Sequence, residues 1–183
     1  MEGIKIVILD AATLGADADI TVFDKLGEVT AYPLTEPTDV AVRIKDCDVC
    51  IINKVKLSGE VLANAKKLKL ICVAATGYDN VDTDYCKKNG IALCNVAGYS
   101  VHSVSQLTLA MVLSASVNLN QFRNSVADGS YSRGSGQNIL TPVYHELLGK
   151  TWGIIGFGGM GSHHYHKLLK EQEIVCTGVW DMG

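Results

Sequence analysis

Short apolar runs rich in β-branched side chains recur along the first half of the chain, and polar, helix-favouring segments separate them. Continuous apolar runs of this kind, bounded by turn-forming residues, are typical of strands buried on both faces of a parallel sheet. The pattern predicts five strands, at Ile4–Leu9, Glu28–Tyr32, Asp48–Asn53, Leu68–Ala74 and Ile91–Asn95.

The segments between these strands carry the signals with which helices begin and end. Ser58 and Asp82 each precede a helix-like segment and can cap its first turn. Gly90 can end the second of these helices in a left-handed conformation. Because strands that alternate with helices form a parallel sheet with helices on both faces, we expect residues 1–98 to form a small α/β domain of the flavodoxin-like type.

The second half of the chain has a different pattern. From Val101 to about Asp128 it predicts one long helix that is apolar on most sides, and such a helix is usually buried at a domain or subunit interface. The segment from Gly129 to Thr141 is rich in Gly and Ser and predicts a loop, and a new apolar strand follows at Trp152–Ile155. We therefore place a second domain at residues 99–183.

A glycine-rich turn, Gly156-Phe157-Gly158-Gly159-Met160-Gly161, connects this strand to a helical segment at Ser162–Lys170. In a turn of this spacing the first glycine permits the tight bend and the second lets the backbone approach a pyrophosphate. The third allows the helix to pack closely on the strand. The setting predicts an N-terminal portion of a Rossmann-type domain, in which N–H groups at the helix N-terminus meet the phosphates of a dinucleotide.

The strand-like segment from Val175 onward ends in an acidic residue, Asp181, about 20 positions after the turn. A carboxylate there can bind the ribose hydroxyls and would repel a 2′-phosphate, which favours NAD over NADP. A P-loop is excluded because Ser162-His163 stands where it requires Lys-Ser or Lys-Thr. A methyl-donor-binding enzyme with a similar turn stays open at this point.

Charge and hydropathy exclude several partners. The net charge is −3 and the basic residues are scattered, so neither a nucleic acid nor an anionic membrane surface is an expected partner. The most apolar stretch, Leu107–Leu119, is interrupted by polar residues and is shorter than the roughly 18 residues that span a bilayer. Since the chain also begins directly in a strand-like segment, without a leader pattern, we expect a cytoplasmic protein.

Six cysteines occur, and the first two, Cys47 and Cys50, have the spacing of a redox motif. A working redox pair lies at a helix N-terminus, whereas this pair leads into a buried strand. We therefore interpret both as small core residues of a protein in a reducing compartment. No cluster of Cys and His has metal-site spacing, so no metal is expected.

The segment Ala75–Asp82 follows the fourth strand, at the edge where open α/β sheets bind ligands. Gly77 permits an unusual backbone conformation in which neighbouring N–H groups can point at an anion. Taken alone, a routine strand-to-helix turn capped by Asp82 is the simpler interpretation. A phospho-receiver domain is disfavoured, because Asn53 and Val96 end the strands where it needs Asp and Lys.

Three stretches, read together and in order, carry a family resemblance. They are Ala75–Asp82, Asn95–Gln106 and Glu146–Gly158. The combination resembles the D-isomer-specific 2-hydroxyacid dehydrogenases, and within them the glycerate dehydrogenase (hydroxypyruvate reductase) branch. The resemblance implies an NAD-dependent oxidoreductase that acts on a small D-2-hydroxy or 2-oxo acid, with glycerate and hydroxypyruvate favoured. It also implies a substrate domain followed by an incomplete NAD-binding domain.

The resemblance implies roles for particular residues. Thr76 and Gly77 match the loop that binds the substrate carboxylate, and Asn53 and Lys54 face the same cleft as further substrate candidates. The cofactor-binding residues that it implies are Thr76, Gly156, Gly158, Gly159, Met160, Gly161 and Asp181. The long helix at residues 101–128 matches the segment that links the domains and forms the family's homodimer.

Two departures from the family pattern stand out: Leu107 occupies a position that usually holds His or a similar residue, and Ser162–His166 replaces a small or apolar helix face. In the family the substrate-binding Arg, the proton-transferring His and its carboxylate partner all follow the position of Asp181. We therefore expect no catalytic residue, and no turnover, in the 183-residue chain alone. The alternative is a non-catalytic fragment that binds nucleotide or dimerises. The histidines expected to be merely solvated are His102, His145, His163, His164 and His166.

Overall fold

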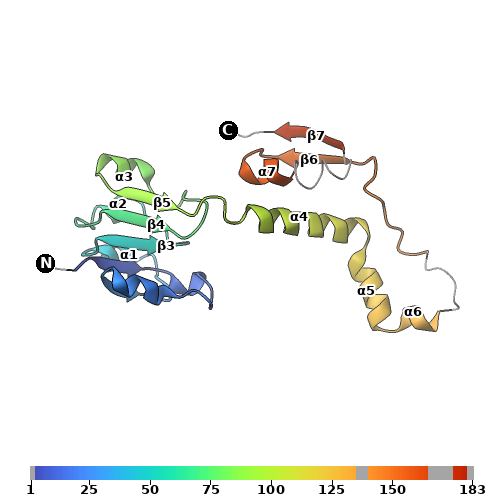
Figure 1. Cartoon of the computed structure of the whole chain (residues 1–183), viewed down its shortest axis with the longest axis horizontal. Helices are drawn as coiled ribbons and strands as arrows, with labels where there is room; N and C mark the ends of the chain where they lie inside the picture. Colours follow the sequence, from blue (N-terminus) through green and yellow to red (C-terminus); the bar gives the residue numbers. More distant parts are fainter. Residues whose placement is uncertain (1–2, 135–139, 165–174, 181–183) are drawn as a thin grey trace. The chain divides into compact units, whose positions relative to one another are not determined.

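The structure is a computed structural model that describes residues 3–134, 140–164 and 175–180. It divides into two compact units, Met1–Ala97 and Gly98–Gly183. Figure 1 draws the first in blue to green and the second in yellow to red.

The first unit is built on a five-stranded parallel sheet in the order β2-β1-β3-β4-β5. All five predicted strands are confirmed, each slightly shorter than its apolar run. Since the strand order reverses between β1 and β3, the carboxyl ends of these two strands form a switch point, where sheets of this type bind ligands. The strands are β1 (Lys5–Ile8), β2 (Glu28–Ala31), β3 (Val49–Ile52), β4 (Leu70–Val73) and β5 (Ala92–Asn95).

Three short helices cover one face of this sheet, and their apolar side chains form the main core with residues of β1, β3 and β4. They are α1 (Val40–Ile44), α2 (Gly59–Leu62) and α3 (Thr83–Lys88). Two 3₁₀ helices, η1 (Ala11–Thr13) and η2 (Ile20–Lys25), contribute to a smaller cluster on the opposite face, around Ile6, Ile8 and Ile51.

The predicted helix signals of this unit are confirmed. The side chain of Ser58 accepts a hydrogen bond from the backbone N–H of Val61 (3.4 Å), and that of Asp82 accepts one from the N–H of Tyr85 (2.9 Å). Gly90 has a φ of 68° and follows α3 in the left-handed conformation, so the chain can turn at once into β5.

The prediction of one helix from Val101 to Asp128 is wrong. The structure has α4 (Val101–Ser116) and α5 (Leu119–Ala127), separated at Asn118, whose φ is 52°. Long-range bonds hold this break: the Asn118 side chain donates to the carbonyl of Val143 (2.9 Å), and the N–H of His145 donates to the carbonyl of Ser116 (3.1 Å). The predicted loop at Gly129–Thr141 also contains a short helix, α6 (Ser130–Arg133).

The structure does not show the buried face expected for the long helix among the residues that it describes. Among the described residues of α4 only Ser105 is buried. Several large apolar side chains of α4 are instead exposed: Val104, Leu107, Met111 and Leu113.

The second unit also contains the start of a βαβ arrangement. Strand β6 (Thr151–Ile155) leads through the glycine turn into α7 (Gly159–His164), and β7 (Val175–Trp180) pairs with β6 in parallel. The predicted strand–turn–helix setting is therefore confirmed. Within the described ranges, no helix has the length and apolarity required to cross a bilayer.

Candidate functional site

A buried carboxylate organises the switch point of the five-stranded sheet. Asp10 follows β1 and is only 2% exposed. Its oxygens accept hydrogen bonds from the backbone N–H groups of Asn53 (2.9 Å), Lys54 (2.5 Å) and Val55 (3.2 Å). Three donors on one buried carboxylate fix the loop after β3 against the end of β1, so Asp10 positions the loop that carries the predicted substrate residues.

Two asparagines continue this network. The Asn53 amide donates to the carbonyl (3.2 Å) and the hydroxyl (3.0 Å) of Thr13, which turns its NH₂ group toward the loop after β1. The Asn80 amide donates to the carbonyl of Val55 (2.8 Å) and so joins the loop after β3 to the segment after β4. Both amides therefore hold loops of the chain together. The sequence pattern could indicate only that polar residues follow these strands, not which loops they bond.

The loop after β4 presents free backbone donors. Among the described residues, the N–H groups of Thr76, Gly77 and Tyr78 have no hydrogen-bond acceptor. The loop itself is held in place: the Thr76 hydroxyl donates to the carbonyl of Val96 (3.1 Å), and the Asn95 amide donates to the carbonyl of Thr76 (2.7 Å). Three adjacent unpaired donors on an anchored loop suit a carboxylate, which accepts several hydrogen bonds.

Gly77 does not have the positive φ of a left-handed residue. A Cβ at this position would lie 3.2 Å from the Asp79 carboxylate, so a larger residue here would require the Asp79 side chain to shift. The unusual backbone conformation expected at Gly77 stays a prediction.

Lys54 lines a cavity whose wall does not include Thr76 or Gly77. A cavity of about 550 Å³ lies beside the switch point, and its wall includes Asp10, Thr35, Lys54 and Lys56, but neither Thr76 nor Gly77. The structure therefore links the two predicted substrate loops through Asn80, but it does not bring Lys54 and Thr76 into one pocket.

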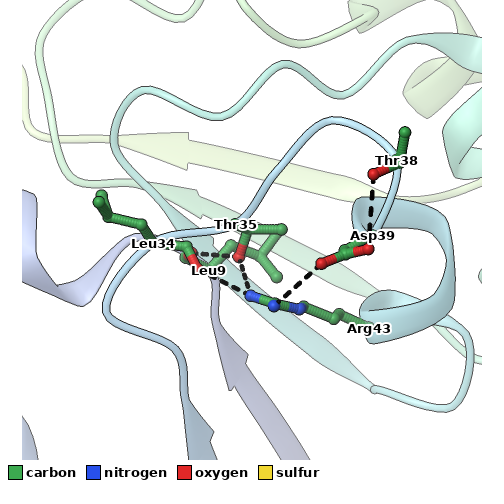
Figure 2. A network of polar contacts seen from close by, with 6 residues as sticks. All are labelled: Leu9, Leu34, Thr35, Thr38, Asp39 and Arg43. Carbon is green, nitrogen blue, oxygen red and sulfur yellow. Dashed lines mark hydrogen bonds and ion pairs between the residues drawn. The ribbon is translucent and has the colours of Figure 1, made fainter.

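The wall of this cavity is fixed by Arg43 of α1 (Figure 2). The guanidinium donates to the carbonyl of Leu34 (2.8 Å) and the hydroxyl of Thr35 (2.7 Å), and it pairs with Asp39 at 3.2 Å. The Thr35 hydroxyl in turn donates to the carbonyl of Leu9. With its donors used in this way, Arg43 braces the loop after β2.

The glycine turn of the second unit has the predicted geometry. Gly156 has a φ of 86°, a conformation that favours glycine. A Cβ on Gly161 would collide with the carbonyl oxygen of Gly156 and would lie 3.4 Å from Ile154, whereas a Cβ on Gly158 or Gly159 would meet nothing within 4 Å. Gly161 therefore permits close packing of α7 on β6, whereas Gly158 and Gly159 leave open space above the turn.

A cavity of about 500 Å³ lies at this turn, between α4 and β6, and Gly156, Gly158, Gly159 and Gly161 line it. Ser105 of α4 also lines it; this residue is 3% exposed, and its hydroxyl has no partner among the described residues. A buried hydroxyl without a partner is costly. The open space over the glycines and the unpaired Ser105 hydroxyl together fit a polar ligand such as a dinucleotide.

The side chains of two predicted cofactor-binding residues lie outside the part of the chain that the structure describes. Met160 lies in α7, but the structure describes only its backbone, and Asp181 lies outside the described residues. His166 also lies outside them. His102 and His163 pack edge to face, with ring centroids 4.5 Å apart; His102 is nevertheless exposed, as expected, whereas His163 is half-buried.

The expectation that the first two cysteines are core residues is confirmed. Cys47 and Cys50 are buried. Burial raises the pKa of Cys47 to about 11 and the pKa of Cys50 well above its usual range, which makes both poor nucleophiles. Among the described residues no group of three or more metal-ligating side chains occurs.

Comparison with known proteins identifies the relatives of this chain. The family model for the catalytic domain of D-isomer specific 2-hydroxyacid dehydrogenases matches residues 6–175. A hydroxypyruvate reductase of Blautia hydrogenotrophica is 33% identical over 162 residues, which cover 86% of this chain and 50% of that protein. A glycerate dehydrogenase of Methylorubrum extorquens is 30% identical over 159 residues, again 86% of this chain and 50% of that protein.

A solved structure agrees with these relatives. The NAD⁺-bound 3-phosphoglycerate dehydrogenase of Entamoeba histolytica superposes with a TM-score of 0.65 and 25% identity, covering 98% of this chain and 54% of that one. The chain thus spans about half the length of the relatives it matches. With the parallel sheet, the anchored Thr76 loop and the glycine turn all in family order, this chain belongs to the D-isomer specific 2-hydroxyacid dehydrogenase family.

Proposed function

We propose that the chain supplies the substrate loop and the dinucleotide turn of an NAD-dependent oxidoreductase that acts on a small D-2-hydroxy or 2-oxo acid. The observation that carries this proposal is the row of unpaired N–H groups at Thr76, Gly77 and Tyr78, in a chain of this family. Glycerate and hydroxypyruvate are the favoured substrates, because the relatives include a hydroxypyruvate reductase and a glycerate dehydrogenase.

The two units would divide the work as the resemblance implies, with a substrate domain at residues 1–98 and the interdomain helix and first part of the NAD-binding domain at 99–183. In the first, the N–H groups at residues 76–78 hold the substrate carboxylate. In the second, the N–H groups of Gly158–Gly161 hold the pyrophosphate over the open space of the turn, and Asp181 binds the ribose. Bound NAD would exchange a hydride with the substrate.

The 183-residue chain alone is expected to bind NADH and to catalyse no turnover, because the Arg, carboxylate and His of the family follow the position of Asp181. Isothermal titration calorimetry should record heat with NADH and less with NADPH, whose 2′-phosphate meets Asp181. A steady-state assay should show no hydroxypyruvate-dependent NADH oxidation.

The calorimetry and the steady-state assay test cofactor binding and catalysis separately. Measurable turnover would contradict the expected inactivity while supporting the proposed reaction. Absence of heat with both nucleotides would contradict cofactor binding by this chain, and of the alternative it would leave only a non-catalytic fragment that dimerises.

The exposed apolar side chains of α4 support the proposal that the protein forms a homodimer through residues 101–128. Met111 is 57% exposed and lines an apolar hollow with Ala110 and Ala115. Sedimentation velocity should show a species of twice the mass of one chain. Met111→Lys should shift it to the monomer, because burying an unpaired charge in an apolar interface is costly. Gln106→Lys, at an exposed polar position of the same helix, should leave it a dimer; a monomeric wild type at micromolar concentration would contradict the proposal.

A further inference from the structure

Two cysteines that no part of the proposed function uses lie opposite each other in the sheet of the first unit. Cys72 of β4 and Cys94 of β5 are direct partners in the parallel register. Their Sγ atoms lie 3.4 Å apart. Alternation along β4 places Ile71 and Val73 in the main core, so the two thiols lie on the opposite face of the sheet, where Cys72 packs beside the cluster under η2.

The pair differs from Cys47 and Cys50 in its access to solvent. Cys94 is exposed and Cys72 is half-buried, whereas Cys47 and Cys50 are buried. Partial burial and the neighbouring Cys94 raise the pKa of Cys72 to about 12, so at neutral pH Cys72 is almost entirely protonated. Cys94 is therefore the thiol that a reagent in solution meets first.

The backbone geometry suits a bond between these two sulfurs. Neighbouring strands lie about 4.8 Å apart, and disulfides join residues whose Cα atoms are about 4.4–6.8 Å apart. Bond formation requires the two sulfurs to approach by a little more than 1 Å and the two Cβ atoms to lie about 3.5–4.5 Å apart, so rotation about χ1 must be accompanied by a small approach of β4 and β5.

We propose that Cys72 and Cys94 form a redox-active dithiol, which a low-molecular-weight disulfide such as oxidised glutathione converts reversibly into an intrachain disulfide. The Cys94 thiolate attacks one sulfur of glutathione disulfide, whose S–S bond breaks, and one glutathione leaves and takes up a proton. Cys72 then attacks the Cys94 sulfur, a second glutathione leaves, and it accepts the proton of Cys72. Two protein thiols are oxidised, and one glutathione disulfide is reduced to two glutathiones.

The second step is favoured by the arrangement of the pair. Once Cys94 carries glutathione it can no longer become a thiolate, so its contribution to the high pKa of Cys72 disappears. The Sγ atom of Cys72 is already beside the sulfur that it must attack, and such proximity replaces a bimolecular encounter. Disulfides that form in reducing compartments are usually transient and either catalytic or redox-sensing.

The disulfide would act on the loop after β4. Asn95 directly follows Cys94 and donates to the carbonyl of Thr76 (2.7 Å). The N–H of Val96 donates to the carbonyl of Ala75 (3.0 Å), while the Val96 carbonyl accepts from Thr76 (3.1 Å). A crosslink between β4 and β5 would therefore hold the strand that anchors this loop, whether or not the loop binds a substrate.

The experiment treats the full chain with oxidised glutathione, alkylates the remaining thiols in denaturant and measures the intact mass. Two of the six cysteines should lose their reactivity, and reduction should restore them. A tryptic digest without reduction should contain a peptide that joins residues 70–87 to residues 89–123. Because the first of these also contains Cys86, fragment-ion sequencing must assign the bond to Cys72.

Matched variants complete the test. Cys94→Ser and Cys72→Ser should each abolish the joined peptide, and Cys86→Ser should retain it. In the oxidised wild type, hydrogen exchange of the amides in residues 92–97 should slow at least several-fold relative to the reduced chain. The proposal is overturned by a glutathione adduct on Cys94 without the joined peptide, by a bond between two chains, by a bond to another cysteine, or by six reactive thiols after treatment.

Discussion

Replacing Asp10 by Ala is expected to lower the free energy of unfolding of the first unit by about 3 kcal/mol. The substitution leaves the backbone N–H groups of Asn53, Lys54 and Val55 without the carboxylate that they share. A fully buried donor that loses its acceptor costs about 1–3 kcal/mol; these three bonds are only partly buried, so water at the edge of the sheet reduces the sum. Domains have a total stability of only about 5–15 kcal/mol, so the loss would be a large part of it.

Unfolding of the first unit can be distinguished from unfolding of the second by the choice of spectroscopic signal. Both tryptophans, Trp152 and Trp180, belong to the second unit. Urea unfolding followed by far-UV circular dichroism should therefore shift for Asp10→Ala, while tryptophan fluorescence should keep its midpoint. Amide exchange in β1 and β3 should become faster.

Two further variants test the cause of the loss. Asp10→Asn keeps the size of the side chain but only one accepting oxygen, so it should cost about half as much. Asp17→Ala removes an exposed carboxylate and should change stability by less than about 0.5 kcal/mol. If Asp10→Ala unfolds at the wild-type urea concentration, the carboxylate does not hold the loop after β3.

The strands could be predicted from the sequence because each is a continuous apolar run that buries side chains on the sheet. The glycine turn could be predicted for a similar reason: Gly156 and Gly161 are needed locally, one for its φ of 86° and the other for the close approach of α7 to β6. Strands and turns of this kind depend on neighbouring residues, so they can be predicted without knowing the contacts that distant segments make.

The features that could not be predicted depend on contacts between distant segments. Asn118 interrupts an otherwise helical pattern, and its left-handed conformation is held by bonds to the segment around Val143. Asp10 and Asn80 each bond a loop that starts more than twenty residues away. A polar residue at the end of a strand shows that a side chain is available there, but it does not show which loop that side chain holds.

Gly158 and Gly161, which the glycine spacing assigns to the pyrophosphate and to helix packing, have different surroundings in the structure and can therefore be tested separately. Gly161→Ala is expected to weaken NADH binding at least about tenfold, or about 1.4 kcal/mol, and also to lower the stability of the second unit. The new Cβ would collide with the Gly156 carbonyl, so α7 must move off β6. Alanine is the better helix former by about 1 kcal/mol, so any net loss comes from this collision.

Gly158→Ala separates the ligand from the fold. A Cβ there meets nothing within 4 Å in the chain itself, so the tryptophan unfolding midpoint should stay unchanged. NADH binding should still weaken about tenfold, because the methyl group occupies the space through which the pyrophosphate approaches the backbone. Ser162→Ala is the matched control and should bind as the wild type does, because the Ser162 hydroxyl donates, within the described part of the chain, to the carbonyl of Gly159 alone. Calorimetry and urea unfolding on the same preparations decide the matter: if Gly158→Ala binds NADH like the wild type, the nucleotide does not lie over this turn.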